Sequence, residues 1–263
     1  MKAFAVALLI LLGAGTVHAE KDYVPWYRGK YGRNRILHMS VTAGLGGVWL
    51  AGSTVLKDRF TAAECRWCEP PGFDKSTRNA LVWNDVKRAG FLSDLTAYAI
   101  APTVGLTLLI IADRDASWSR LIDDIIPVAE TVAVSQVLVQ MVKFMTGRQR
   151  PYGYFNNPKY KSGSEDLLSF PSGHSSLGFA ITASAALICH WRHYWTEPYV
   201  WGTGIALSLT TEYLRIGADR HWLSDVVAGG AVGIASGLLI PRLMRRDLVI
   251  APVPGGAAVV GQF

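Results

Sequence analysis

The sequence predicts an all-α protein, a bundle of six helices embedded in a membrane, with a short β-like tail at the C-terminus. Half of its 263 residues are apolar, and six apolar stretches recur after Ala19. Most of them have about the 20 residues that a bilayer-spanning helix needs. The stretches cover residues 36–56, 95–112, 122–145, 175–191, 199–214 and 226–244.

A soluble helical protein with buried central helices is the alternative. The mean hydropathy is only +0.23, and Glu130 and Glu212 lie inside two of the stretches. The stretch 95–112, in contrast, holds no charge. Small residues are frequent in the first, fourth, fifth and last stretches, as in helices that pack closely in lipid. Trp residues near several predicted helix ends are typical of interfacial anchors, and these features together favour the membrane.

Residues 1–19 resemble a signal peptide or a short N-terminal anchor. Lys2 gives a positive start, residues 4–12 are apolar, and Val17-His18-Ala19 before Glu20 has the form of a cleavage site. Cleavage would leave the next segment outside the cytoplasm. If all six stretches cross the membrane and the candidate site residues face the periplasm, the segment before residue 36 must lie in the cytoplasm. A cleaved signal peptide and six full spans therefore conflict.

Three resolutions of that conflict stay open. The N-terminal segment is an uncleaved anchor, one stretch does not cross, or the protein is soluble. Basic residues just before the first stretch favour a cytoplasmic start. The loop at 57–88 carries seven Lys and Arg and would be periplasmic, so the charge count does not decide. The expected location is a bacterial-type inner membrane with the site facing the periplasm. The alternative is a soluble periplasmic protein released by signal cleavage.

One domain is expected over residues 20–247, because neither a repeat nor a low-complexity tract divides the chain. The tail at 248–263 has two short β-prone runs on either side of Pro254-Gly255-Gly256, which predicts a hairpin.

The three cysteines also bear on location. Cys65 and Cys68 lie close together in a polar loop, and we expect a local disulfide between them, as in proteins of oxidising compartments. A zinc knuckle would need a second ligand pair of similar spacing, and none follows. Cys189 lies in an apolar stretch and is expected to be a buried thiol.

The net charge of +6 and the pI of about 9.3 favour an anionic partner. The basic residues are dispersed, without a basic helix or run, so nucleic acid is not the expected partner. Phosphate esters and anionic lipid headgroups fit the charge equally well.

The first chemical motif is Lys143-x6-Arg150-Pro151. A spacing of seven is two helical turns, which predicts Lys143 and Arg150 on one helix face before Pro151 ends the helix. A lysine point charge beside an arginine fork suits a tetrahedral oxyanion. Taken alone, the pair is more typical of interfacial cations at a helix end.

The second motif is Phe170-Pro171-Ser172-Gly173-His174, which precedes an apolar helical run. It predicts a tight turn into a helix N-terminus, where free N–H groups bind anions. Ser172 would add a hydroxyl, Gly173 would allow close backbone approach, and His174 would transfer a proton near neutral pH. An ordinary helix cap with an incidental histidine is the alternative.

The third motif is Arg215-x5-His221-x3-Asp225. His221 and Asp225, at i and i+4, are expected on one helix face, where the carboxylate would orient the imidazole as a nucleophile. A plain surface contact is the alternative for the pair by itself. Glu212, three residues before Arg215, is expected to pair with that arginine.

Together, these three motifs resemble the signature of the type 2 phosphatidic acid phosphatase (PAP2) and vanadium haloperoxidase superfamily. The resemblance covers a core at 122–244 and implies a helical bundle of that type. One departure is Leu214, where the family usually has Ser.

The resemblance implies a role for each motif residue. Phosphoryl oxygens would be bound by Lys143, Arg150, Ser172, Gly173 and Arg215. The catalytic residues would be His221 as nucleophile, Asp225 orienting it, and His174 as the acid for the leaving oxygen and then the base for water. Three cations would supply the charge stabilisation that phosphoryl transfer needs, so no metal or other cofactor is implied. Neighbouring Arg148, Arg220 and Tyr152 are expected only at the rim.

The expected function is a metal-independent phosphatase acting through a phosphohistidine on a phosphorylated lipid or a small phosphate ester. A membrane enzyme with membrane lipids around it favours a lipid-linked monoester or diphosphate. A soluble periplasmic acid phosphatase of broad specificity and a vanadate-dependent peroxidase are the alternatives. Vanadate is expected to inhibit in each phosphatase case.

Overall fold

The computed structural model describes residues 34–112, 118–245, 249–253 and 256–260. The predicted signal or anchor at 1–19 lies outside these residues. Six long helical segments form one bundle, as predicted. They are α2 (Asn34–Ser53), α5 (Val86–Leu95) continued through the π-helical turn η1 (Thr96–Ile100) into α6 (Ala101–Ala112), α7 (Trp118–Thr146), α9 (Gly173–Arg192), α10 (Glu197–Gly217) and α11 (Leu223–Arg245).

Four of the described helices are long and apolar enough to cross a membrane: Arg35–Ser53, Val86–Ala112, Arg120–Thr146 and Leu223–Arg245. Their outer faces expose large apolar side chains such as Val48, Leu106 and Leu239, as expected for surfaces that face lipid tails. These features mark the chain as a membrane protein. The apolar stretches predicted α9 and α10 as well, and these two helices are not among the four.

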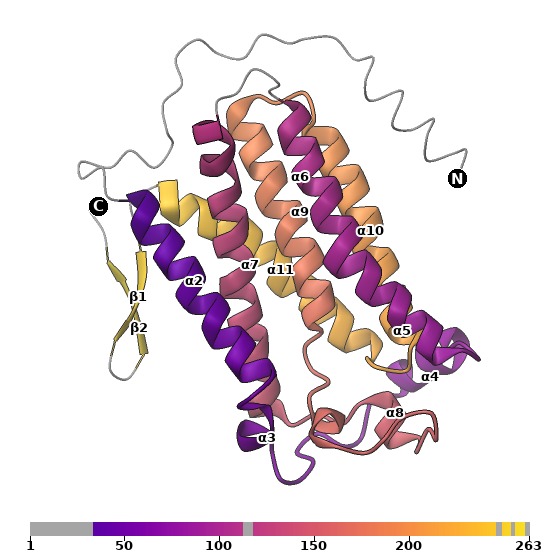
Figure 1. The fold of residues 1–263 in the computed structure, drawn as a ribbon. Coiled ribbons are helices and arrows are strands. Elements are labelled where there is room, and N and C mark those ends of the chain that lie inside the picture. The colour runs from indigo at the N-terminus through magenta and orange to yellow at the C-terminus, as the bar shows by residue number, and fades with distance from the viewer. Residues whose placement is uncertain (1–33, 113–117, 246–248, 254–255, 261–263) are drawn as a thin grey trace.

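Helix α9 is the centre of the bundle, flanked by α7 and α10 with α11 crossing behind it (Figure 1). Gly229, Gly233 and Gly237 repeat at every fourth position of α11. A Cβ at Gly229 would lie 2.3 Å from the Ser172 carbonyl oxygen, and one at Gly233 would lie 2.4 Å from that of Ser176. Glycine is therefore required where α11 crosses α9, as in closely packed membrane helices.

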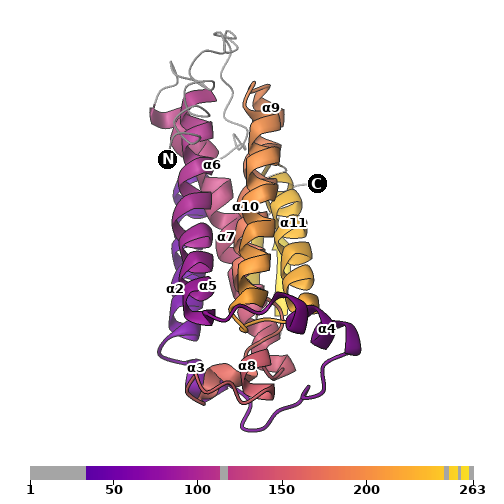
Figure 2. The ribbon, with the colours of Figure 1, turned by 90° about the vertical axis from the view of Figure 1, so that its right-hand side faces the viewer.

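Short elements close one end of the bundle. They are α3 (Lys57–Phe60), α4 (Gly72–Leu81), α8 (Pro151–Tyr154) and the 3₁₀ turn η2 (Ser164–Leu167), which gather at the lower end in Figures 1 and 2. A disulfide joins Cys65 to Cys68 in this region, as their spacing predicted. Cys189 is buried at the other end, in an apolar cluster with Leu109 and Ala185.

The C-terminal tail forms the predicted hairpin. Strand β1 (Val249–Val253) pairs antiparallel with β2 (Gly256–Val260), with Val249 opposite Val260 and Val253 opposite Gly256.

Candidate active site

A cavity of about 230 Å³ opens at the closed end of the bundle. Its lining comes in part from the ends of α7 and α10, the start of α9 and the turn before α11. Six of the predicted site residues line it: Lys143, Arg150, Gly173, His174, Arg215 and His221. Ser172 and Asp225 are fully buried next to these residues and are not among those that line the cavity.

Lys143 and Arg150 reach the cavity by a different path from the one predicted. Helix α7 ends at Thr146 and does not continue to Pro151, because Gly147 turns the chain with a φ of 53°. Arg150 then lies just before α8, where its Nε donates to the Glu165 carbonyl at 2.8 Å. The helical spacing argument was therefore wrong, although both cations face the same cavity.

The second motif begins α9 as predicted. Ser172 caps the helix, and its Oγ accepts from the Ser175 N–H at 3.4 Å. Gly173 lies against α7, where Gln136 Nε2 donates to its carbonyl at 3.1 Å. A Cβ on Gly173 would come within 3.2 Å of Gln136 Oε1 and 3.9 Å of Lys143 Nζ, so this glycine lets α9 approach the cationic wall.

His174 has a partner that the sequence did not indicate. Its Nε2 lies 2.7 Å from Asp94 Oδ1, and the ring contacts Tyr98 edge-on at 4.8 Å. Arg215 Nη1 lies 3.3 Å from the same carboxylate oxygen. Asp94 therefore holds the histidine and the arginine together at the edge of the cavity.

The expected pair between Glu212 and Arg215 is wrong. Among the described residues, Asp94 is the carboxylate within ion-pair distance of Arg215. Glu212 instead lies against Gly230 of α11. Glu212 and Arg215 are three residues apart on α10, but their side chains have different neighbours. Arg215 pairs with Asp94, which lies on α5.

His221 is buried in the turn between α10 and α11, with 1% of its side chain exposed. Its Nδ1 lies 3.4 Å from Asp225 Oδ2. The expected shared helix face is wrong in detail, because α11 begins only at Leu223 and His221 precedes it. The imidazole and the carboxylate nevertheless come within ion-pair distance across the first turn of the helix, although Nδ1 has no hydrogen-bond partner among the described residues.

The electrostatics of the cavity keep His221 neutral. Burial lowers the pKa of His221 well below its ordinary value of 6.5, and the positive charges around the cavity lower it further. A neutral imidazole whose Nδ1 faces a carboxylate leaves Nε2 with a free lone pair. His221 is thus suited to act as a nucleophile at neutral pH.

Arg148 does not lie at the rim, where it was expected. Its side chain is 1% exposed, and its guanidinium stacks on the Trp67 ring at 3.8 Å. Nη1 donates to Asp225 Oδ1 at 2.5 Å and Nη2 to Asp74 Oδ2 at 2.7 Å. Tyr152 is buried as well, whereas Arg220 does line the cavity.

A second cavity of about 190 Å³ adjoins the first and shares Lys57, Glu165 and Arg220 with it. Its polar wall also includes Tyr152, Tyr160, Lys161, Ser164 and Asp166. In the ranges that the structure describes, no group of three His, Cys, Asp or Glu side chains is arranged to hold a metal ion.

Fold and site define a class: a helical membrane protein with a cationic, histidine-containing cavity at one end of its bundle. The PAP2 superfamily model matches residues 124–248, the region that holds all three motifs. The match confirms, over this region, the family resemblance that the three motifs indicated.

Named relatives share part of the chain. It is 32% identical over 137 residues to the lipid A 1-phosphatase of Porphyromonas gingivalis, covering 51% of this chain and 27% of the relative. It is 30% identical over 183 residues to phospholipid phosphatase 2 of Bos taurus, covering 58% of this chain and 62% of the relative. The chain thus spans less than two thirds of either relative.

Among solved structures, one similar chain is a transmembrane PAP2-type phosphatidylglycerolphosphate phosphatase from Bacillus subtilis. The two superpose with a TM-score of 0.48 and 13% sequence identity, over 80% of this chain and 96% of that one.

Proposed function

We propose that the chain is a phosphatase that hydrolyses a phosphate monoester or diphosphate on a lipid, through a phosphohistidine formed on His221. One observation carries the proposal: a buried, neutral His221 backed by Asp225 faces the same cavity as three cations, Lys143, Arg150 and Arg215. The names of the two relatives, a lipid A phosphatase and a phospholipid phosphatase, support a lipid substrate.

In the first step, His221 Nε2 would attack phosphorus while the bond to the leaving oxygen breaks. His174 would give its proton to that oxygen, and Asp225 would accept the hydrogen bond of the Nδ1–H as His221 becomes positive. In the second step, water would attack the phosphohistidine and lose a proton to His174. Inorganic phosphate then leaves and both histidines return to their starting states.

The cations would stabilise the transition state. Charge spreads over the phosphoryl oxygens as the transferred group moves, and fixed positive groups in a cavity shielded from water interact with it strongly. Lys143 from α7, Arg150 before α8 and Arg215 from α10 come from three elements, so they can surround the group. Vanadate, an oxyanion of similar shape, is expected to compete for the same cavity.

A lipid substrate is also supported by where the cavity lies. It opens at the end of the apolar helices, and its lining includes the apolar faces of Trp49, Val139 and Leu168 beside the cations. An acyl or prenyl chain could therefore remain near lipid while the phosphate is bound. The apolar helices count against the soluble periplasmic enzyme.

The orientation that we propose places the cavity on the periplasmic side. The disulfide between Cys65 and Cys68 lies at the same end of the bundle as the cavity, and disulfides persist in oxidising compartments. Added protease should cut the exposed loop at 157–164 in spheroplasts of expressing cells. Cleavage only after the membrane is ruptured would reverse the orientation.

Phosphate release by the purified chain tests the function. Phosphatidate, a polyprenyl diphosphate and a soluble aryl phosphate are compared in detergent, with EDTA present and no metal added. We expect EDTA-resistant release that is faster from at least one lipid than from the aryl phosphate. A preference for the aryl phosphate would favour a broad-specificity phosphatase. Absence of release from all three would contradict the proposal, and halide peroxidation after vanadate loading would then indicate a peroxidase.

A further inference from the structure

Asp74 is a fully buried carboxylate on α4, far from the three motifs in sequence and outside the region that the family model matches. Its Oδ1 accepts from the Ser224 N–H at 2.9 Å. Its Oδ2 accepts from Ser224 Oγ and from Arg148 Nη2, both at 2.7 Å. A buried charge with this many fitted donors is part of a built network and not a surface contact.

The same arginine reaches the carboxylate behind His221. Arg148 Nη1 donates to Asp225 Oδ1 at 2.5 Å, while Asp225 Oδ2 accepts from Ser169 Oγ at 2.5 Å and from the Trp222 N–H at 2.8 Å. Oδ2 is also the oxygen that faces His221 Nδ1. Hydrogen bonds therefore run from Asp74 through Arg148 to Asp225, and His221 lies within ion-pair distance of that last carboxylate.

Charge balance gives this chain a consequence for reactivity. Arg148 lies between two buried carboxylates, so the trio carries one net negative charge. If Asp74 were neutral, the full charge of Arg148 would fall on Asp225 and offset it. Asp225 would then stabilise a positive His221 less well, because a carboxylate neutralised by one cation attracts a second one weakly.

We propose that Asp74 is a positioning residue for the reaction: it balances Arg148 and so leaves Asp225 free to orient His221 and stabilise its positive charge. The proposal rests on the phosphatase function for its kinetic expression. Asp74 acts through Arg148 and Asp225 and does not touch the substrate.

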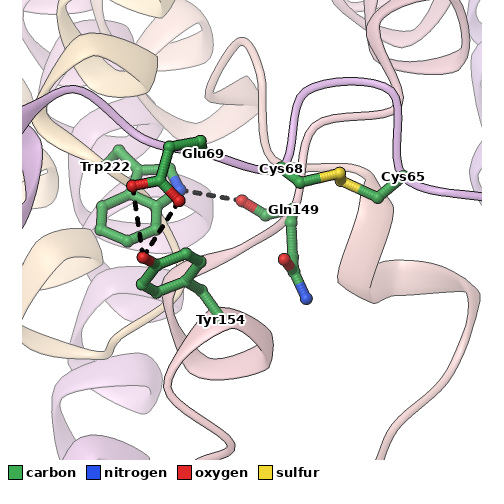
Figure 3. The surroundings of a disulfide bond; sticks show 6 residues. All are labelled: Cys65, Cys68, Glu69, Gln149, Tyr154 and Trp222. Atoms are coloured by element: carbon green, nitrogen blue, oxygen red, sulfur yellow. Dashed lines mark hydrogen bonds between the residues drawn. A yellow bond between two sulfur atoms is a disulfide. The ribbon is translucent and has the colours of Figure 1, made fainter.

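The disulfide segment holds this arrangement together. Trp67, between the two bridged cysteines, stacks on Arg148, and its carbonyl accepts from the Gln149 N–H at 3.2 Å. The carbonyl of the same residue, Gln149, accepts a hydrogen bond from Trp222 Nε1 at 2.8 Å (Figure 3). The loop before α4 thus packs directly on the arginine that Asp74 balances.

The first test is Asp74→Asn, which keeps the size of the side chain and removes its charge. We expect kcat to fall on the order of tenfold to a hundredfold, by analogy with the loss seen when a residue that orients a metal-binding histidine is changed. KM should stay within about twofold, because Asp74 does not contact the substrate. Glu69→Gln is the matched control: Glu69 lies in the same segment, is exposed, and pairs with Lys75 and Tyr154. Its kcat should match the wild type.

A variant that restores the net charge distinguishes an electrostatic role of Asp74 from a role in packing. Asp74→Asn with Arg148→Gln returns the trio to one negative charge. The acid limb of the rate profile should move to lower pH in Asp74→Asn, since less negative charge disfavours protonated His221, and should move back in the double variant. The other charged or titratable groups around His221 are unchanged in all three proteins: Lys143, Arg150, His174, Arg215 and Asp225, together with Glu165 and Arg220 on the cavity wall.

Nitrogen NMR of labelled histidine supplies a readout that needs no turnover, so it stays informative even if the phosphatase assay fails. His221→Ala identifies the signal. In the wild type we expect the proton on Nδ1, shared with Asp225; Asp74→Asn should weaken that state and the double variant should restore it. Identical His221 signals in the three proteins, each checked for folding by thermal unfolding, would overturn the proposal. So would an acid limb that does not move.

Discussion

Replacing His221 with alanine is expected to reduce phosphate release by at least on the order of 10⁴-fold, because the nucleophile and the covalent intermediate are both lost. The cavity should still bind phosphate, since Lys143, Arg150 and Arg215 come from other elements. The measurement is kcat on the best lipid substrate, with vanadate affinity as the test of an intact anion site.

His190→Ala is the matched control for His221→Ala. His190 lies on the far end of α9, is 66% exposed, and pairs with Glu197. Its loss should leave kcat unchanged. If His221→Ala kept a tenth of the wild-type rate in protein that unfolds at the wild-type temperature, His221 would not be the nucleophile.

Replacing Asp225 with asparagine is expected to lower kcat on the order of 10³- to 10⁴-fold, as for the buried carboxylate that orients the histidine of a hydrolytic triad. An amide has one oxygen where the carboxylate has two. In one orientation its N–H₂ group would face the Arg148 donor, and in the other it would face the donors of Ser169 and Trp222. The substitution also removes the charge that stabilises a positive His221. The free energy of unfolding should fall as well, by about 3 kcal/mol, since Arg148 loses part of its buried counter-charge.

Asp219→Asn separates the two effects of that change. Asp219 is equally buried and binds Arg78 through both oxygens, at 2.7 and 2.8 Å, but it does not line the cavity. Its loss should destabilise the fold to a similar degree while kcat per folded molecule stays near the wild type. Equal losses of kcat in the two variants would mean that Asp225 acts through stability alone.

The bundle was predictable because helix length and apolarity are local properties of the sequence. Six runs of apolar residues correspond to the six long helices, and the motif residues fall at their ends. The predicted helix boundaries were less accurate where a helix extends beyond its apolar run into polar residues. Helix α5 begins at Val86, before the apolar run, and so Asp94 was left outside the predicted segment.

The contacts of the site that were missed join residues far apart in the chain. Asp74 meets Ser224 across 150 positions, and Asp94 meets His174 across 80. Neither carboxylate belongs to a motif, and periodicity reports only which residues share one helix. Where spacing was used directly, as for the Lys143–Arg150 pair, a positive φ at Gly147 broke the helix and the geometry differed.

The most direct test of the central claim is a search for phosphate on His221 itself. Enzyme and labelled lipid phosphate are mixed, quenched in alkali within milliseconds, and the peptide containing His221 is analysed by mass spectrometry. We predict a phosphoryl group on that imidazole, stable in alkali and lost in acid, and absent from His221→Ala. Rapid turnover with no such adduct at any quench time, or an adduct on another residue, would contradict the mechanism.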